Sequence, residues 1–294
     1  MARIAIIGVG AIGGVIASLL QQAGHELVLC VRRPLEVLTV ETTDGPVAVR
    51  AAIVTDPAKA PTVDWVLIAT KAYDVDGAAK WLERLRAEGA PVAVLQNGVE
   101  HRERFAPYVP TDSILPVVVD CPAERQSPEL VRQRGVMHLK APVGELGEAF
   151  IKLFAGTAAD AVTVPDFTTV AWRKLCHNAA GVLPALLLQP SGVMQNEAIG
   201  ETGLQIVREC IAVGRAEGAT LDDDVAEAVL RAYRAAPADG INSLHADRLA
   251  GRPMEIDARN GVIVRLGKKH GIPTPCNQMA VALLEVLAQE KANA

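Results

Sequence analysis

Short apolar runs alternate with segments of helical period along the first half of the chain. The runs have the length and β-branched content of buried strands, and they lie at residues 3–7, 26–31, 65–69, 91–95 and 114–119. Helical patterns separate the earlier runs and extend to about residue 22 and over residues 75–88 and 100–108. Strands that alternate with helices predict a parallel, doubly wound sheet. Weaker patterns predict edge strands at 136–139 and 161–164 and a helix at 148–155.

The pattern changes near Asp166, after which strand signals almost disappear. Long helical stretches follow at residues 167–188, 195–217, 222–235, 243–249, 255–270 and 277–289. We therefore predict an α/β fold in which an N-terminal Rossmann domain (residues 1–166), with a doubly wound parallel sheet, precedes an all-α C-terminal domain (residues 167–294).

Composition excludes several functional classes. The 294 residues are half apolar and carry a net charge of −5 without a clustered basic face, which argues against nucleic-acid binding. No apolar segment reaches the ~18–20 residues that a membrane-spanning helix needs. The five scattered cysteines, without a CxxC pair, indicate reduced thiols in a cytoplasmic protein, and the six histidines show no metal-ligand spacing. An apolar face of the helical domain is consistent with a homodimer.

A glycine-rich motif follows the first predicted strand. Gly8, Gly10 and Gly13 fit GxGxxG at the start of a predicted helix, within a strand–helix–strand unit. The first glycine permits the tight turn, the second lets the backbone approach a pyrophosphate, and the third allows close helix–strand packing. The helix N-terminus, at Ala11 and Ile12, offers backbone N–H groups to the anion. The alternative is an ordinary strand–helix turn.

The end of the second predicted strand indicates which nucleotide binds. NAD sites usually place an acid there to bind the ribose 2′-hydroxyl, but this chain has Arg32 and Arg33 and no acid. A guanidinium suits a 2′-phosphate. We therefore predict NADP(H) as the cofactor, bound through Arg32, the alternative being a solvated arginine pair.

Polar residues follow two later strands, at the sheet edge where open α/β sheets bind ligands. Lys71 follows the strand that ends at Ala69, and Asn97 follows the strand that ends at Leu95. Both are expected to face the ligand crevice. A surface lysine and a simple Asn-Gly turn are the alternatives.

In combination, the motifs resemble those of the ketopantoate reductase (2-dehydropantoate 2-reductase) family over essentially the whole chain. The resemblance rests on four elements, which are residues 8–14 (GVGAIGG), the pair 70–72 (TKA) and 96–98 (QNG), residues 172–175 (WRKL) with Asn178, and Ser243 with Glu255 and the segments 255–257 (EID), 260–261 (NG) and 270–273 (HGIP).

The resemblance implies NADPH-dependent reduction of a 2-oxo acid to a 2-hydroxy acid, with 2-dehydropantoate and pantoate as the expected pair. It implies that Lys174 is the catalytic acid and that Glu255 stands beside the substrate and supports catalysis. It also implies that substrate is held by Asn97, Asn178 and Ser243 as well as by these two, and that Lys71 and Asn97 lie near the cofactor.

General chemistry agrees with these roles and leaves alternatives open. Hydride delivery to a ketone leaves negative charge on oxygen, which a nearby ammonium stabilises and protonates. Lys174 and Asn178 are four residues apart and share a helical face, although a surface lysine shows the same spacing. Ser243 is alternatively a helix N-cap, and Glu255 a favourable charge at a helix start.

One position departs from the family pattern. Val182 stands where a second asparagine is common, a turn beyond Asn178. The loss of that polar contact keeps a second hypothesis open, namely a related reductase of a different branched 2-oxo acid. A third hypothesis, from another class, is a non-enzymatic NADP(H)-binding regulator, which would need neither Lys174 nor Glu255.

Overall fold

The computed structural model describes residues 1–292, in two compact units. The first unit comprises Met1–Gln96 and Glu100–Phe167, and the second comprises Asn97–Val99 and the described residues from Thr168 onward. Residues 293–294 of the predicted second domain lie outside the described residues. The assignment of nucleotide binding to residues 1–166 and of substrate binding to residues 167–294 stays a prediction.

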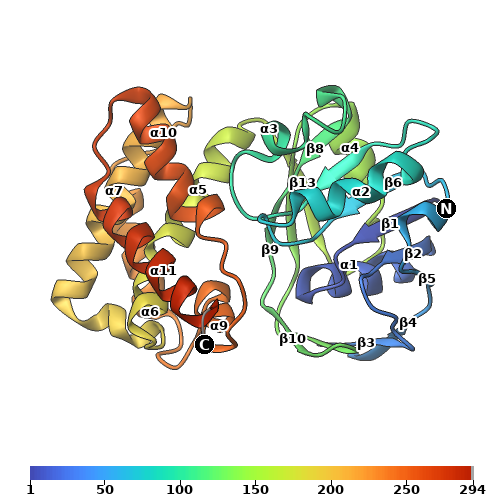
Figure 1. The fold of residues 1–294 in the computed structure, drawn as a ribbon, viewed down its shortest axis with the longest axis horizontal. Coiled ribbons are helices and arrows are strands. Elements are labelled where there is room, and N and C mark those ends of the chain that lie inside the picture. Colours follow the sequence, from blue (N-terminus) through green and yellow to red (C-terminus); the bar gives the residue numbers. More distant parts are fainter. Residues whose placement is uncertain (293–294) are drawn as a thin grey trace. The chain divides into compact units, whose positions relative to one another are not determined.

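A six-stranded parallel sheet forms the centre of the first unit (Figure 1). Its strands are β1 (Arg3–Ile7), β2 (Glu26–Cys30), β5 (Ala52–Val54), β6 (Trp65–Ile68), β7 (Val92–Val94) and β8 (Ile114–Pro116). Their order, β5-β2-β1-β6-β7-β8, corresponds to the doubly wound arrangement 3-2-1-4-5-6. The predicted fold class, a Rossmann sheet followed by helices, is confirmed.

Alternate residues of each strand enter two different cores. Ile4 and Ile6 of β1 pack in one cluster with apolar residues of α1 (Ala11–Gln22), whereas Ala5 and Ile7 pack in another with residues of α2 (Val75–Leu85) and α3 (His101–Phe105). Side chains of a strand point alternately to the two faces of the sheet. Both faces are therefore covered, which explains why the strands are almost continuously apolar.

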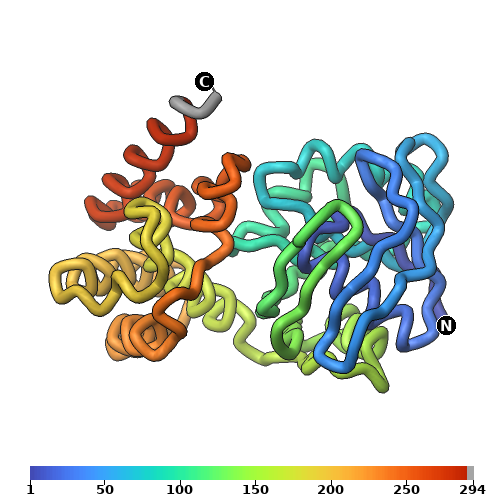
Figure 2. The backbone as a smooth tube through the Cα atoms, turned by 90° about the horizontal axis from the view of Figure 1, so that it is seen from below, coloured from blue at the N-terminus to red at the C-terminus, as the bar shows by residue number. Residues whose placement is uncertain are grey.

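Two hairpins that the sequence pattern did not predict lie side by side in the first unit (Figure 2). They are β3 (Leu38–Thr42) with β4 (Gly45–Val49), and β10 (Ala123–Ser127) with β11 (Leu130–Gln133). Together they form a sheet in the order β10-β11-β3-β4, which packs on α1. A Cβ on Gly14 of α1 would approach Cγ2 of Val131 to 2.8 Å, so a larger residue there would displace the second sheet.

A three-stranded sheet completes the first unit. It contains β9 (Val118–Asp120), β12 (His138–Pro142) and β13 (Asp160–Val164), in the order β13-β12-β9, with α4 (Glu145–Lys152) connecting β12 to β13. The strand predicted at 136–139 is therefore central in this sheet, and the prediction of an edge strand there was wrong. Two short 3₁₀ turns, η1 (Pro57–Lys59) and η2 (Thr111–Ser113), lie in loops.

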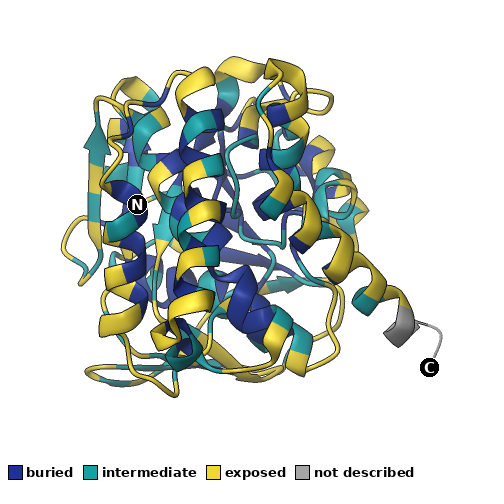
Figure 3. Cartoon of the chain, turned by 90° about the vertical axis from the view of Figure 1, so that its left-hand side faces the viewer, coloured by how far each residue is buried: buried dark blue, intermediate teal, exposed yellow. Residues whose placement is uncertain are grey.

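The second unit is helical throughout its described residues. Its elements are α5 (Phe167–Ala180), α6 (Val182–Leu187), η3 (Ser191–Gln195), α7 (Glu197–Ala216), α8 (Val225–Ala235), α9 (Ser243–Leu249), the π-helical turn η4 (Asp257–Gly261), α10 (Val262–His270) and α11 (Pro275–Ala292). Buried residues alternate with exposed ones along these helices, as their amphipathic sequences require (Figure 3).

Two predicted helices of this unit are interrupted. The segment 167–188 breaks at Gly181, where a Cβ would lie 2.6 Å from the Tyr233 hydroxyl, and it continues as α6. The segment 255–270 begins with the π turn before it becomes regular. No helix among residues 1–292 is long and apolar enough to cross a membrane.

A buried polar network ties α7 to the start of α11. Asn277, which is fully buried, donates to the carbonyl of Ile206 at 3.1 Å and to Glu209 at 2.7 Å, and it accepts from Asn260 at 2.8 Å. Glu209 also accepts from the backbone N–H groups of Cys276 and Asn277, at 2.8 and 2.9 Å. A carboxylate at a helix N-terminus is favourable, so the network fixes where α11 begins.

Candidate functional site

The glycine motif forms a tight turn between β1 and α1. Gly8 has a φ of +93°, and a Cβ there would lie 2.6 Å from the backbone nitrogen of Thr70. A Cβ on Gly13 would lie 2.1 Å from the carbonyl oxygen of Gly8. A Cβ on Gly10, in contrast, meets nothing within 4 Å. Gly8 and Gly13 are therefore required by the protein's own packing, whereas Gly10 faces open space.

The N-terminus of α1 has the features of an anion site. Gly10 occupies the N-cap position and gives no side-chain cap, and the first turn contains no acidic residue. The first N–H groups of a helix have no partner within it, and the helix dipole favours a negative charge there. Ala11 and Ile12, which begin this turn, are only partly buried. The turn and the open space at Gly10 thus fit the pyrophosphate of a dinucleotide.

Arg32 lies two residues beyond the end of β2, as predicted. Its side chain is 89% exposed, and its Nη1 is 3.9 Å from Oδ2 of Asp74, at the start of α2. Arg33 beside it is also exposed. An exposed guanidinium after the second strand has the reach and geometry to bind a 2′-phosphate.

Gln96 connects the loops after β6 and β7, a role that the sequence pattern did not reveal. Its Nε2 donates to Thr70 Oγ1 at 2.9 Å and to the carbonyl of Lys71 at 3.1 Å. Its own carbonyl lies 2.9 Å from Nε2 of His101, and burial lowers the pKa of His101, so the neutral ring donates this bond. The backbone that carries Lys71 is thereby held at the carboxyl edge of the sheet.

Three of the predicted substrate residues meet within the second unit. Asn97 Nδ2 donates to Glu255 Oε2 at 2.9 Å, and Asn178 Nδ2 lies 3.5 Å from Asn97 Oδ1. These residues are separated by as many as 158 positions in sequence. Glu255 is only 3% exposed, and a buried carboxylate requires such polar partners. We call these three residues the amide–carboxylate cluster.

Lys174 lies on α5 one helical turn before Asn178. It is partly buried, whereas Leu175 and Ala179 of the same helix are fully buried. Residues four apart on a helix lie on one face, so Lys174 and Asn178 lie on the same side of α5. Its role as catalytic acid stays a prediction.

Ser243 is the first residue of α9 and is exposed. The N-cap of this helix is its neighbour Asn242, whose side chain accepts from the backbone N–H of His245 at 3.0 Å. The alternative interpretation of Ser243 as the N-cap was therefore wrong. Asn242 also donates to the carbonyl of Gly181 at 2.9 Å, which places the start of α9 beside the end of α5.

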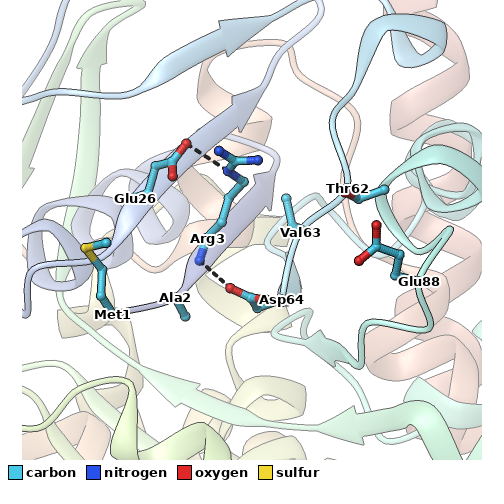
Figure 4. Close-up of a pocket in the computed structure, with 8 residues that line it drawn as sticks. All are labelled: Met1, Ala2, Arg3, Glu26, Thr62, Val63, Asp64 and Glu88. Carbon is cyan, nitrogen blue, oxygen red and sulfur yellow. Dashed lines mark hydrogen bonds and ion pairs between the residues drawn. The ribbon is translucent and has the colours of Figure 1, made fainter.

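A pocket of about 300 Å³ lies at the opposite, amino-terminal edge of the sheet (Figure 4). Arg3 bridges this region, because its Nε binds Glu26 at 2.8 Å and its backbone N–H binds Asp64 at 2.7 Å. Ligands of open α/β sheets bind at the carboxyl edge instead. The carboxylates of Glu26, Asp64 and Glu88 line this pocket and make it unsuited to a phosphate.

Among residues 1–292, no group of three or more His, Cys, Asp or Glu residues could hold a metal ion.

Comparisons with known proteins match both units. The family model described as "Ketopantoate reductase PanE/ApbA" matches residues 4–146, and "Ketopantoate reductase PanE/ApbA C terminal" matches residues 166–288. The chain is 49% identical over 289 residues to the 2-dehydropantoate 2-reductase of Caulobacter vibrioides. The matched region covers 98% of this chain and 100% of the relative. It is 43% identical over 284 residues to the same enzyme of Mycobacterium tuberculosis, which covers 96% of both chains.

The fold is also similar to that of solved structures. A PanE/ApbA family ketopantoate reductase from Ralstonia eutropha JMP134 superimposes with a TM-score of 0.90 and 31% identity, over 99% of each chain.

Proposed function

Because the chain belongs to the ketopantoate reductase family, as the sequence motifs indicated, we propose that it reduces 2-dehydropantoate to pantoate with NADPH. The reaction consumes one NADPH and one proton and releases NADP⁺. The single observation that carries this proposal is the amide–carboxylate cluster, in which Asn97, Asn178 and Glu255 are joined by their side chains. Two amides and a carboxylate suit a substrate that carries both a carboxylate and a hydroxyl group.

The residues of the first unit hold the nucleotide in this proposal. Gly8 and Gly13 shape the turn, Gly10 leaves room for the pyrophosphate, and the N–H groups of Ala11 and Ile12 bind it. Arg32 binds the 2′-phosphate. Lys71 lies near the cofactor in this proposal, as does Asn97, which belongs to the second unit. NADPH, when bound, supplies the hydride.

The residues of the second unit hold the oxo acid and supply the proton. Lys174 Nζ stabilises the negative charge that develops on the carbonyl oxygen and then donates a proton to it. Asn97, Asn178 and Ser243 bind the substrate's polar groups. Glu255 orients the Asn97 amide through their 2.9 Å hydrogen bond and stands beside the substrate.

Replacement of Lys174 by alanine tests the assignment of the acid. We expect kcat to fall by about 10²-fold or more, as for a lost acid or electrostatic group, with little change in the Kd of NADPH. Arg173→Ala is a matched control, because this exposed cation is the adjacent residue of α5. A Lys174→Ala variant with wild-type kcat would exclude the role of catalytic acid. A wild-type chain that binds NADPH but reduces none of the tested oxo acids would favour a nucleotide-binding regulator.

The burial of Val182 supports an alternative to 2-dehydropantoate as the substrate, namely a different branched 2-oxo acid. This side chain is fully buried in the core of the second unit, so it makes no polar contact of the kind expected from an asparagine at this position. Steady-state rates of NADPH oxidation with 2-dehydropantoate and with analogues lacking its hydroxyl group distinguish the two. If kcat/KM for 2-dehydropantoate does not exceed that for the analogues, the second substrate class is correct.

We also propose that the chain forms a homodimer. Met279, Leu283 and Val286 lie on one face of α11 and are 54%, 49% and 54% exposed. A contiguous exposed apolar face favours association, and a second copy of the chain is the partner we expect to cover it. Light scattering of the wild type and of Leu283→Lys tests this, since a monomeric wild type would contradict it.

Reduced thiols support a cytoplasmic location. All five cysteines are free, and Cys30 and Cys210 are buried in apolar cores, where burial raises the pKa of both thiols. Disulfides are common in oxidising compartments and rare in the cytoplasm. Fractionation of cells that produce the protein tests the proposed location.

A further inference from the structure

The end of α5, the helix that carries Lys174 and Asn178, is held by side chains from three separate segments. Four consecutive or nearly consecutive carbonyl groups accept hydrogen bonds there, instead of being left without a partner as in an ordinary helix terminus. The donor–acceptor pairs are Tyr233 with His177 (3.0 Å), Arg259 with Asn178, Asn260 with Ala179 (3.2 Å) and Asn242 with Gly181 (2.9 Å).

Arg259 differs from the other donors because it carries a charge. Its side chain is 2% exposed, and among the described residues it forms no ion pair within 4 Å. Burial lowers the pKa of the guanidinium, while Tyr233, Glu255 and Asp247 raise it. A buried cation is costly unless partners compensate it, and the negative end of the α5 dipole at Asn178 is such a partner. Its Nε remains without a hydrogen-bond partner.

The π turn allows two adjacent residues to reach α5. The N–H of Gly261 donates to the carbonyl of Ile256 at 2.9 Å, five residues earlier, which widens the helix by one residue. Successive residues of a regular helix point about 100° apart, yet Arg259 and Asn260 bind the successive carbonyls of Asn178 and Ala179. Turns of this kind occur frequently at functional sites.

From this geometry we propose that Arg259 is a positioning residue for the reductase reaction. It holds the carbonyl of Asn178, and through it fixes the last turn of α5, so that Asn178 stays in the amide–carboxylate cluster and Lys174 stays in register with it. The inference rests on the proposed function of this site. It predicts that the guanidinium acts on turnover without touching substrate or nucleotide.

The matched control is Arg248. Its Nη1 donates to the carbonyls of Ala185 and Leu186, the latter at 2.6 Å, so it caps the end of α6 as Arg259 caps the end of α5. Both arginines belong to the same unit and bind helix-terminal carbonyls. Arg248 caps a helix that carries neither Lys174 nor Asn178.

The experiment compares Arg259→Met with Arg248→Met in the full chain, measuring Tm, the Kd of NADPH and steady-state kinetics. We expect a lower Tm for both variants, because each removes the arginine that binds helix-terminal carbonyl groups. We expect only Arg259→Met to lose kcat/KM, by about 10- to 100-fold, because small misplacements of catalytic groups are costly. The Kd of NADPH should stay within about twofold of wild type in both, since both arginines belong to the second unit, whereas the glycine turn belongs to the first.

Arg259→Lys keeps the charge but loses the forked donor geometry, and it serves if the methionine variant does not fold. It should retain most of the Tm and recover part of the lost kcat/KM. Wild-type kcat/KM in a folded Arg259 variant with lowered Tm would overturn the proposal and make the residue purely structural. Equal losses of kcat/KM in both methionine variants would overturn it too. A wild-type chain without reductase activity would instead refute the proposed function.

Discussion

Replacement of Gly10 by alanine is expected to weaken nucleotide binding while leaving the fold intact. An added Cβ there meets no atom within 4 Å, and the backbone angles, φ −86° and ψ −158°, are open to alanine. Folding should therefore not suffer. The free energy of unfolding should change by less than about 1 kcal/mol, because alanine restricts the unfolded chain more than glycine does but is a poorer N-cap residue.

Nucleotide binding should weaken in the same variant. The open space at Gly10 is where we expect the pyrophosphate to approach the N-terminus of α1, and a methyl group would push it away. A hydrogen bond to a charged group contributes about 1.5–3 kcal/mol. The loss of one such bond corresponds to an increase of about 10- to 100-fold in the Kd of NADPH.

The assay is a fluorescence titration with NADPH, paired with urea unfolding of the same samples. Gly13→Ala is the comparison and should lose stability as well as NADPH binding, because its Cβ would lie 2.1 Å from the carbonyl oxygen of Gly8, within the turn itself. Overpacking of this kind costs about 1–3 kcal/mol of stability. If Gly10→Ala folds and binds NADPH as the wild type does, the assignment of this space to the pyrophosphate is wrong.

Three further predictions concern single side chains. Arg32→Ala should raise the Kd of NADPH by about tenfold or more, through the loss of charged hydrogen bonds, and that of NADH by less than about twofold; equal effects on both would remove the 2′-phosphate assignment. Asp74→Asn should lower the Kd of NADPH by about two- to fivefold, because its carboxylate lies 3.9 Å from Arg32 and repels the phosphate, and high salt should abolish this gain. Asn277→Ala breaks three buried hydrogen bonds and should lower the free energy of unfolding by about 2–4 kcal/mol in urea titrations; a smaller change would show that water replaces the amide.

The sequence predicted the parallel sheet well because its strands are buried on both faces. Residues such as Ile4 and Ile6 on one face, with Ala5 and Ile7 on the other, produce short, β-branched apolar runs that are typical of buried parallel strands. The strands of the two hairpins are partly exposed, and β4 even contains Pro46, so their patterns are short and mixed with polar residues. What stabilises them is their packing on α1, a tertiary contact that local sequence does not record.

The parts of the site that lie close together in sequence were easier to predict than the parts that the fold brings together. The glycine motif is local, and its turn follows from positions within six residues of each other. The amide–carboxylate cluster joins residues up to 158 positions apart, and only the family resemblance brought Asn97, Asn178 and Glu255 together in advance. The roles of Gln96 and Arg259 could not be predicted, because a glutamine after a strand and a single arginine in a helix are usually interpreted as solvent-exposed residues.

The tripeptide Asn97–Val99 belongs to the second unit, although the residues on both sides of it in sequence belong to the first. It follows β7 of the first unit, yet it groups with the helical unit, where Asn97 is the amide partner of Glu255 and Val99 packs against the helical core. A fragment that starts near residue 167 would leave a buried carboxylate without this amide. An exchange of helical units between two such reductases must therefore include residues 97–99 as well, if the carboxylate is to keep its amide partner.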